Sequence, residues 1–164
     1  MKIIRKIGLT LLIILVVLQA YRPAKNDSNK TDNDISKTYA APEDVKSILT
    51  KACYDCHSNN TVYPWYASVQ PIRMFLDNHV TDGKKHMNFN EFSTYRIARQ
   101  YKKLDECMEQ IKEGDMPLES YTIIHKNAVL TDTEKQKLFD WCTSVRDSIK
   151  ARYPADSLVL PKRK

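Results

Sequence analysis

Apolar residues recur every three or four positions along most of this chain, and this period constrains its fold more than any other feature. Thr131 and Glu134 stand at the spacing of a capping box, which predicts the start of the last helix. The expected buried faces of the last two long helices are Ile97, Tyr101, Leu104, Met108 and Ile111, and Leu138, Trp141, Cys142, Val145 and Ile149. No stretch alternates apolar and polar residues as a half-buried strand would. The sequence therefore predicts an all-α domain of four to five helices.

Residues that open and close helices predict three more elements, over residues 42–54, 71–83 and 90–114. A proline begins each of the first two, at a position where its missing N–H has no helical partner. Asn90 is the expected N-cap of the third, and glycines end the second, at Gly83, and the third. Because the chain has only 3 Gly, a Gly-rich phosphate loop of the dinucleotide-binding kind is excluded.

The first forty residues divide into an apolar and a polar segment. Lys2, Arg5 and Lys6 precede an apolar run, which is the pattern of a secretory signal. We predict a signal peptide or an N-terminal transmembrane anchor over residues 1–20, and either would place the rest of the chain outside the cytoplasm. Residues 21–40 are mostly polar and predict a flexible linker.

The formal net charge of +6 has its excess at the two ends of the chain. Residues 1–20 hold three bases and no acid, and the last three residues are all basic. A nucleic-acid binder has a basic stripe through its folded part, so we expect no nucleic-acid partner. The folded domain is predicted over residues 41–150, followed by a solvated basic tail over residues 151–164.

One motif carries recognisable chemistry: Cys53-Tyr54-Asp55-Cys56-His57 is a C-x-x-C-H. This spacing is typical of covalent haem attachment. Two thiols three positions apart on a helix end face the same way, and each can add to one vinyl group of the porphyrin. The imidazole of His57 can then ligate the iron from the proximal side. The motif predicts one haem c, bound through Cys53 and Cys56 with His57 on the iron.

Three other uses of paired cysteines fit the sequence less well. A thioredoxin-like redox pair belongs to a βαβ setting, which this helical pattern does not provide. A tetrahedral zinc site needs a second C-x-x-C or H-x-x-x-H, and none is present. A disulfide between these two cysteines is disfavoured by the two-residue spacer on a helix.

Met116 is the strongest candidate for the second axial ligand of the iron. It stands in Gly114-Asp115-Met116-Pro117, just beyond a predicted helix end, where a loop can bring a thioether to the metal. Packing of Met116 on the core is the alternative. His86, in a polar turn, is the second choice. The weaker candidates are His79, His125, Met74, Met87 and Met108.

Several short stretches together carry a family resemblance. They are Cys53–Asn59, Tyr63-Pro64-Trp65-Tyr66, Pro71, His79-Val80 with Gly83, His86 with Asn88-Phe89, Met116-Pro117-Leu118, and His125 with Leu130-Thr131. Over residues 42–149 the chain resembles the bacterial haem-binding domain family, small exported c-type cytochrome-like domains with one C-x-x-C-H. The resemblance implies a cytochrome c-like monohaem fold, haem on Cys53 and Cys56, His57 as a ligand, and Met116 as the Met-Pro element of c-type cytochromes.

Two further cysteines, Cys107 and Cys142, lie on or beside predicted buried helix faces. Outside the cytoplasm leftover thiols can pair, and such a disulfide would stabilise the domain by roughly 3–4 kcal/mol. Two buried free thiols, acting as small apolar side chains, are the equal alternative.

The expected function is one-electron transfer by a covalent haem c protein, without enzymatic activity. The expected location is the periplasmic side of the bacterial inner membrane, or the free periplasm if the signal is cleaved. Redox proteins would be the partners, with membrane contact through the N-terminal segment. The alternatives are a peroxidase-type haem enzyme and a haem-based ligand sensor, both of which need an open distal position on the iron.

Overall fold

The computed structural model describes residues 1–161, and every regular element in this range is helical. The α-helices are α1 (Lys2–Leu18), α2 (Ile35–Thr38), α3 (Glu43–Ala52), α4 (Tyr54–His57), α5 (Ile72–His86), α6 (Ile97–Glu113), α7 (Glu119–Thr122) and α8 (Asp132–Arg152). The 3-10 helices are η1 (Trp65–Ser68), η2 (Phe89–Thr94), η3 (Lys126–Ala128) and η4 (Ala155–Leu158). The all-α expectation is confirmed, and the short connecting helices bring the α-helices above the expected four to five.

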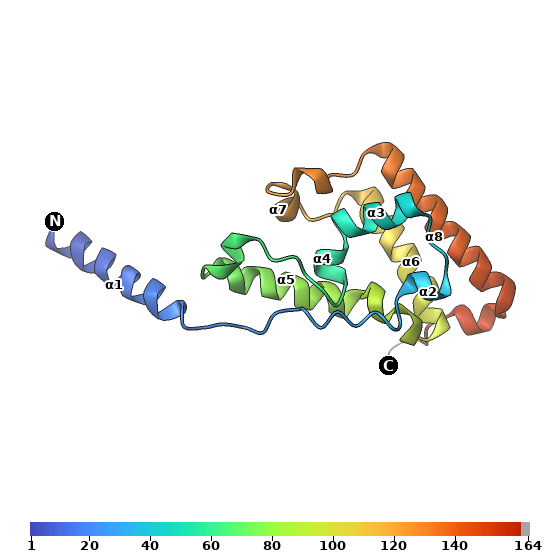
Figure 1. Ribbon diagram of the computed structural model, residues 1–164, viewed down its shortest axis with the longest axis horizontal. Coiled ribbons are helices and arrows are strands. Elements are labelled where there is room, and N and C mark those ends of the chain that lie inside the picture. Colours follow the sequence, from blue (N-terminus) through green and yellow to red (C-terminus); the bar gives the residue numbers. More distant parts are fainter. Residues whose placement is uncertain (162–164) are drawn as a thin grey trace.

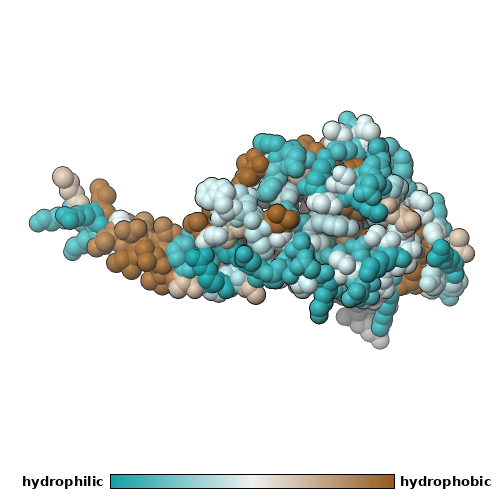
Figure 2. All heavy atoms as spheres, in the orientation of Figure 1, coloured by the Kyte–Doolittle hydropathy of each residue, from teal (hydrophilic) through white to brown (hydrophobic). Residues whose placement is uncertain are grey.

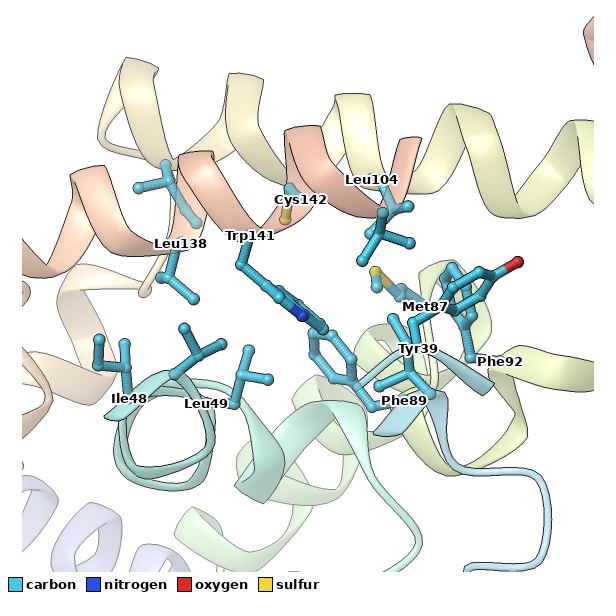
Figure 3. Close-up of a cluster of buried hydrophobic side chains, with 14 of the residues drawn as sticks. Tyr39, Ile48, Leu49, Met87, Phe89, Phe92, Leu104, Leu138, Trp141 and Cys142 are labelled. Carbon is cyan, nitrogen blue, oxygen red and sulfur yellow. The ribbon is translucent and has the colours of Figure 1, made fainter. Parts of the chain in front are cut away.

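Helices α3, α6 and α8 surround the core. In Figure 1, α8 runs beside α6 and α3 lies against α8, while α4 sits between α3 and α5. Figure 3 shows Trp141 pointing from α8 toward Leu49 and Phe89, and its indole N–H donates to the carbonyl of Ala40 at 3.1 Å. The expected face of α8 is confirmed, since Leu138, Trp141, Cys142, Val145 and Ile149 are all buried.

One predicted end of each of the two longest helices of the domain is also confirmed. Thr131 and Glu134 form the full capping box at the start of α8, with the Thr131 N–H donating to the Glu134 carboxylate at 3.0 Å. Gly114 ends α6 with φ +84°, a left-handed conformation that a residue without a Cβ adopts at little cost.

Three other predicted boundaries are wrong. The first helix ends at Ala52, and a separate turn, α4, begins beyond Cys53. Gly83 does not end α5, which continues to His86, because its role is to let another segment approach the helix. Asn90 does not cap α6, which begins at Ile97; its side chain is buried and donates to Asp34 at 2.6 Å.

Residues 21–40 differ from the flexible linker that their composition predicts. Ile35 in α2 is completely buried in the core, and Tyr39 is nearly so. The Asn26 side-chain amide donates to the carbonyl of Ser58 at 2.9 Å, which ties the segment to the loop after α4. Ile35 and Tyr39 are apolar side chains within this polar segment, and their burial packs the segment against the domain.

Helix α1 extends away from the other helices in Figure 1 and has no buried residue. Its apolar side chains form a continuous exposed surface in Figure 2. Of the helices among residues 1–161, none combines the length and the apolar character needed to cross a membrane.

The start of the predicted basic tail is folded. Within η4 (Ala155–Leu158), which packs on α6, Leu158 lies against the core. The basic residues Lys162, Arg163 and Lys164 lie outside the described residues.

Candidate functional site

A cavity of about 680 Å³ is lined by residues of α4, α5, α6 and the segment that leads into α7. Its volume falls within the roughly 300–1,000 Å³ of small-molecule and cofactor sites. Cys53, Cys56, His57, Met116 and His86 all line it. The structure therefore brings the C-x-x-C-H residues and the two preferred candidates for the second ligand to one cavity, although they come from three separate stretches of the chain.

The C-x-x-C-H turn is fixed in place by close packing of α4 against α5. The amide of His57 donates to the carbonyl of Cys53 at 2.9 Å and closes one helical turn. At Gly83 a Cβ would lie 2.6 Å from the carbonyl oxygen of Cys56, closer than real contacts allow. Gly83 therefore sets how near the motif lies to α5, and an isolated glycine inside a helical pattern was the signal for such a contact.

His57 has a defined orientation. Its Nδ1 lies 2.9 Å from the carbonyl oxygen of Met87, which accepts a hydrogen bond when Nδ1 carries the proton. The lone pair of the ring then lies on Nε2, and a backbone acceptor at Nδ1 is how metal-binding histidines are commonly oriented. Burial lowers the pKa of His57 and favours the neutral, ligating form.

The two motif cysteines are half-buried. Burial raises the pKa of Cys53 far above its ordinary value and the pKa of Cys56 to about 11. Reactive redox cysteines of the thioredoxin kind instead have a lowered pKa. These two thiols are therefore protonated at neutral pH, and their environment is unlike that of a thioredoxin-type pair.

The candidates for a second iron ligand fall into two groups, those that line the cavity and those that do not. Met116, His86, His79 and Met87 line the cavity, whereas Met74, Met108 and His125 do not. Met116 packs partly against the core, and its amide donates to the carbonyl of Gln110 at 3.2 Å. His125 instead accepts or donates a hydrogen bond at 2.9 Å with the hydroxyl of Tyr66.

One cavity residue that sequence reasoning missed is Tyr121. Its hydroxyl donates to Asp55, inside the C-x-x-C-H, at 2.7 Å. The same carboxylate accepts from the amide of Val62 at 3.0 Å. Asp55 thus joins the motif to α7 and to the loop after α4, a contact between distant segments that no local pattern indicates.

Cys107 and Cys142 are free cysteines on the packed helices α6 and α8. The Cys142 thiol lies beside that of Cys107, and this contact together with burial raises the pKa of Cys142 well above its ordinary value. A thiol that stays protonated and buried reacts slowly with oxidants and with labelling reagents.

We therefore expect two thiols per chain to react with a maleimide after unfolding without reductant, and Cys142 to stay unlabelled in the native protein. The sample is the protein with haem bound, because thioether bonds to haem would keep the two motif cysteines from reacting with the maleimide. Mass spectrometry of the labelled chain gives the count. A chain that labels only after reduction would instead contain the Cys107–Cys142 disulfide.

The cavity offers a donor set that suits an iron porphyrin. An imidazole nitrogen and a thioether are both haem-iron ligands, and two thiols on one wall can form bonds to the porphyrin edge. The apolar lining includes Ile111, Leu118 and Leu130, which suits the apolar face of the macrocycle. The residues present therefore fit the group that the motif predicts.

The sequence model of one protein family, described as the haem-binding domain, matches residues 13–144. This match covers most of the chain, including all the cavity residues discussed above. No curated protein and no solved structure matches the chain.

Proposed function

The chain belongs to the haem-binding domain family and binds haem, and from this premise we propose that it is a c-type cytochrome-like protein that transfers single electrons. The haem would be covalently attached to Cys53 and Cys56. The observation that carries this proposal is the position of both thiols and of His57 on one wall of a single cavity of about 680 Å³. The proposed fold is that of a cytochrome c-like domain with one haem.

Covalent attachment is supported by the geometry of α4. Cys53 precedes the turn and Cys56 lies within it, and the 2.9 Å hydrogen bond from His57 to Cys53 keeps all three residues in one helical turn. Thioether bonds would retain the haem in a small domain. The porphyrin, when bound, supplies one-electron redox chemistry, while the chain orients it and shields it from water.

Met116 is the favoured second ligand, ahead of His86. His86 directly precedes Met87, whose carbonyl contacts His57, so His86 belongs to the end of α5 that orients the proximal imidazole. Met116 comes from the segment between α6 and α7, separate from both the motif and α5, and it lines the same cavity as His57. With His57 and Met116 both on the iron, no position would remain open for peroxide or a gas.

Replacing Met116 is expected to leave one coordination position of the iron open. We expect the Met116→Ala variant to lose the weak near-infrared band of methionine-ligated ferric haem, to bind carbon monoxide when reduced, and to have a lower reduction potential. Absorption spectra with and without carbon monoxide measure the first two effects.

Met108→Ala is the matched control, because Met108 packs on the core and does not line the cavity. It should retain the wild-type spectrum. If the wild-type ferrous protein already binds carbon monoxide, the distal site is open and a sensor or peroxidase-type function replaces electron transfer. If His86→Ala rather than Met116→Ala changes the spectrum, His86 is the ligand.

We also propose that the protein is exported from the cytoplasm. Lys2, Arg5 and Lys6 followed by the apolar residues of α1 have the pattern of an export signal. Haem c is attached outside the bacterial cytoplasm, so the periplasm is the proposed location. The proposed partners are redox proteins that approach the haem edge.

A further inference from the structure

The peptide group between Met87 and Asn88 is hydrogen-bonded at both of its polar atoms. Its carbonyl oxygen lies 2.9 Å from Nδ1 of His57. Its N–H donates to the hydroxyl oxygen of Tyr95 at 2.9 Å. Both atoms belong to one conjugated amide, so a hydrogen bond at the N–H increases the negative charge on the carbonyl oxygen.

This peptide is also fixed in place by buried asparagines. The Asn88 side-chain amide donates to Oδ1 of Asn59 at 2.8 Å, and its carbonyl oxygen accepts from the amide of Asn90 at 3.0 Å. The amide of Asn59, two residues beyond His57, donates to the Asn90 side chain at 2.7 Å. All three asparagines are buried. The network therefore ties the chain after the C-x-x-C-H to the peptide that His57 contacts.

The Tyr95 ring is itself well positioned. It lies 5.8 Å from the ring of Phe92, centroid to centroid, and the Arg99 guanidinium lies over its face at 4.1 Å. These contacts aim the hydroxyl at Asn88 from outside the cavity, and Tyr95 does not line the cavity itself. Any effect on bound haem would therefore pass through the peptide.

We propose that Tyr95 is a positioning residue that tunes the iron through the Met87–Asn88 peptide and His57. The inference rests on the proposed haem ligation by His57. By polarising the peptide, Tyr95 strengthens the hydrogen bond from His57 Nδ1 and makes Nε2 a stronger donor. A stronger donor stabilises ferric over ferrous iron, so Tyr95 lowers the reduction potential.

The test compares two single hydroxyl deletions in the full-length holoprotein. In Tyr95→Phe the Asn88 N–H loses its acceptor. The matched control is Tyr39→Phe, because the Tyr39 hydroxyl donates to Gln100 at 2.8 Å in the same cluster and does not contact the peptide. We expect Tyr95→Phe to raise the reduction potential and to move the Nδ1–H proton resonance of His57 upfield in the ferrous protein. Tyr39→Phe should change neither.

Equal potentials and unchanged resonances in Tyr95→Phe and wild type would overturn the inference, and so would equal shifts in both variants. A wild-type chain without haem would overturn the proposed function instead. In that case the Nδ1–H resonance of His57 still reports whether the Tyr95 hydroxyl acts on it.

Discussion

Haem should be lost completely from the denatured chain when both motif cysteines are removed. We expect the Cys53→Ala, Cys56→Ala double variant, produced in cells that attach haem c, to show no peroxidase-type haem stain on a denaturing gel. No thioether can form without these thiols, and denaturation releases any haem bound only through His57 and the cavity. The measurement is haem stain per amount of chain.

The chain offers a matched control for this experiment in its other cysteine pair. Cys107→Ala, Cys142→Ala removes the same number of thiols, one of which also lines the cavity. This control should retain the full stain. Haem stain in the motif double variant would show that haem is attached elsewhere. A wild-type chain without haem stain would contradict covalent binding.

A single methyl group at Gly83 should also have a large effect. Its Cβ would lie 2.6 Å from the backbone oxygen of Cys56, so α4 must shift away from α5. We expect Gly83→Ala to destabilise the domain by about 1–3 kcal/mol, as overpacking does. This should occur although alanine in a helix interior is favoured over glycine by roughly 0.5–1 kcal/mol. The same shift disturbs His57 and should lower the haem content per chain.

Thermal unfolding followed by circular dichroism, together with haem content, measures both effects of Gly83→Ala. Thr81→Ala is the control, because Thr81 is exposed on the same helix and should give a stability at or slightly above wild type. An unfolding temperature for Gly83→Ala equal to that of Thr81→Ala would show that α4 and α5 can separate without cost.

Hydrophobic period and capping residues were enough to predict the regular parts of the fold. The face of α8, its capping box and the glycine end of α6 were all predicted, because each depends on residues within a few positions of one another. The end of α5 was predicted too early, at Gly83, because this glycine allows close contact with Cys56 and does not form a turn. Ile35 was missed because one apolar residue in a polar segment carries no period.

The sequence by itself determined the chemistry of the site: the order Cys53, Cys56, His57 is local, and the spacing of two thiols and an imidazole is set by covalent geometry. Only the tertiary structure decided how that site is supported. The Met87 carbonyl beside His57 and the Tyr121 contact with Asp55 each join the motif to a residue 30 or more positions away, and the Tyr95 hydroxyl supports the first of these contacts through the Asn88 N–H. Such contacts depend on how helices pack, and packing brings together residues whose separation in sequence carries no signal.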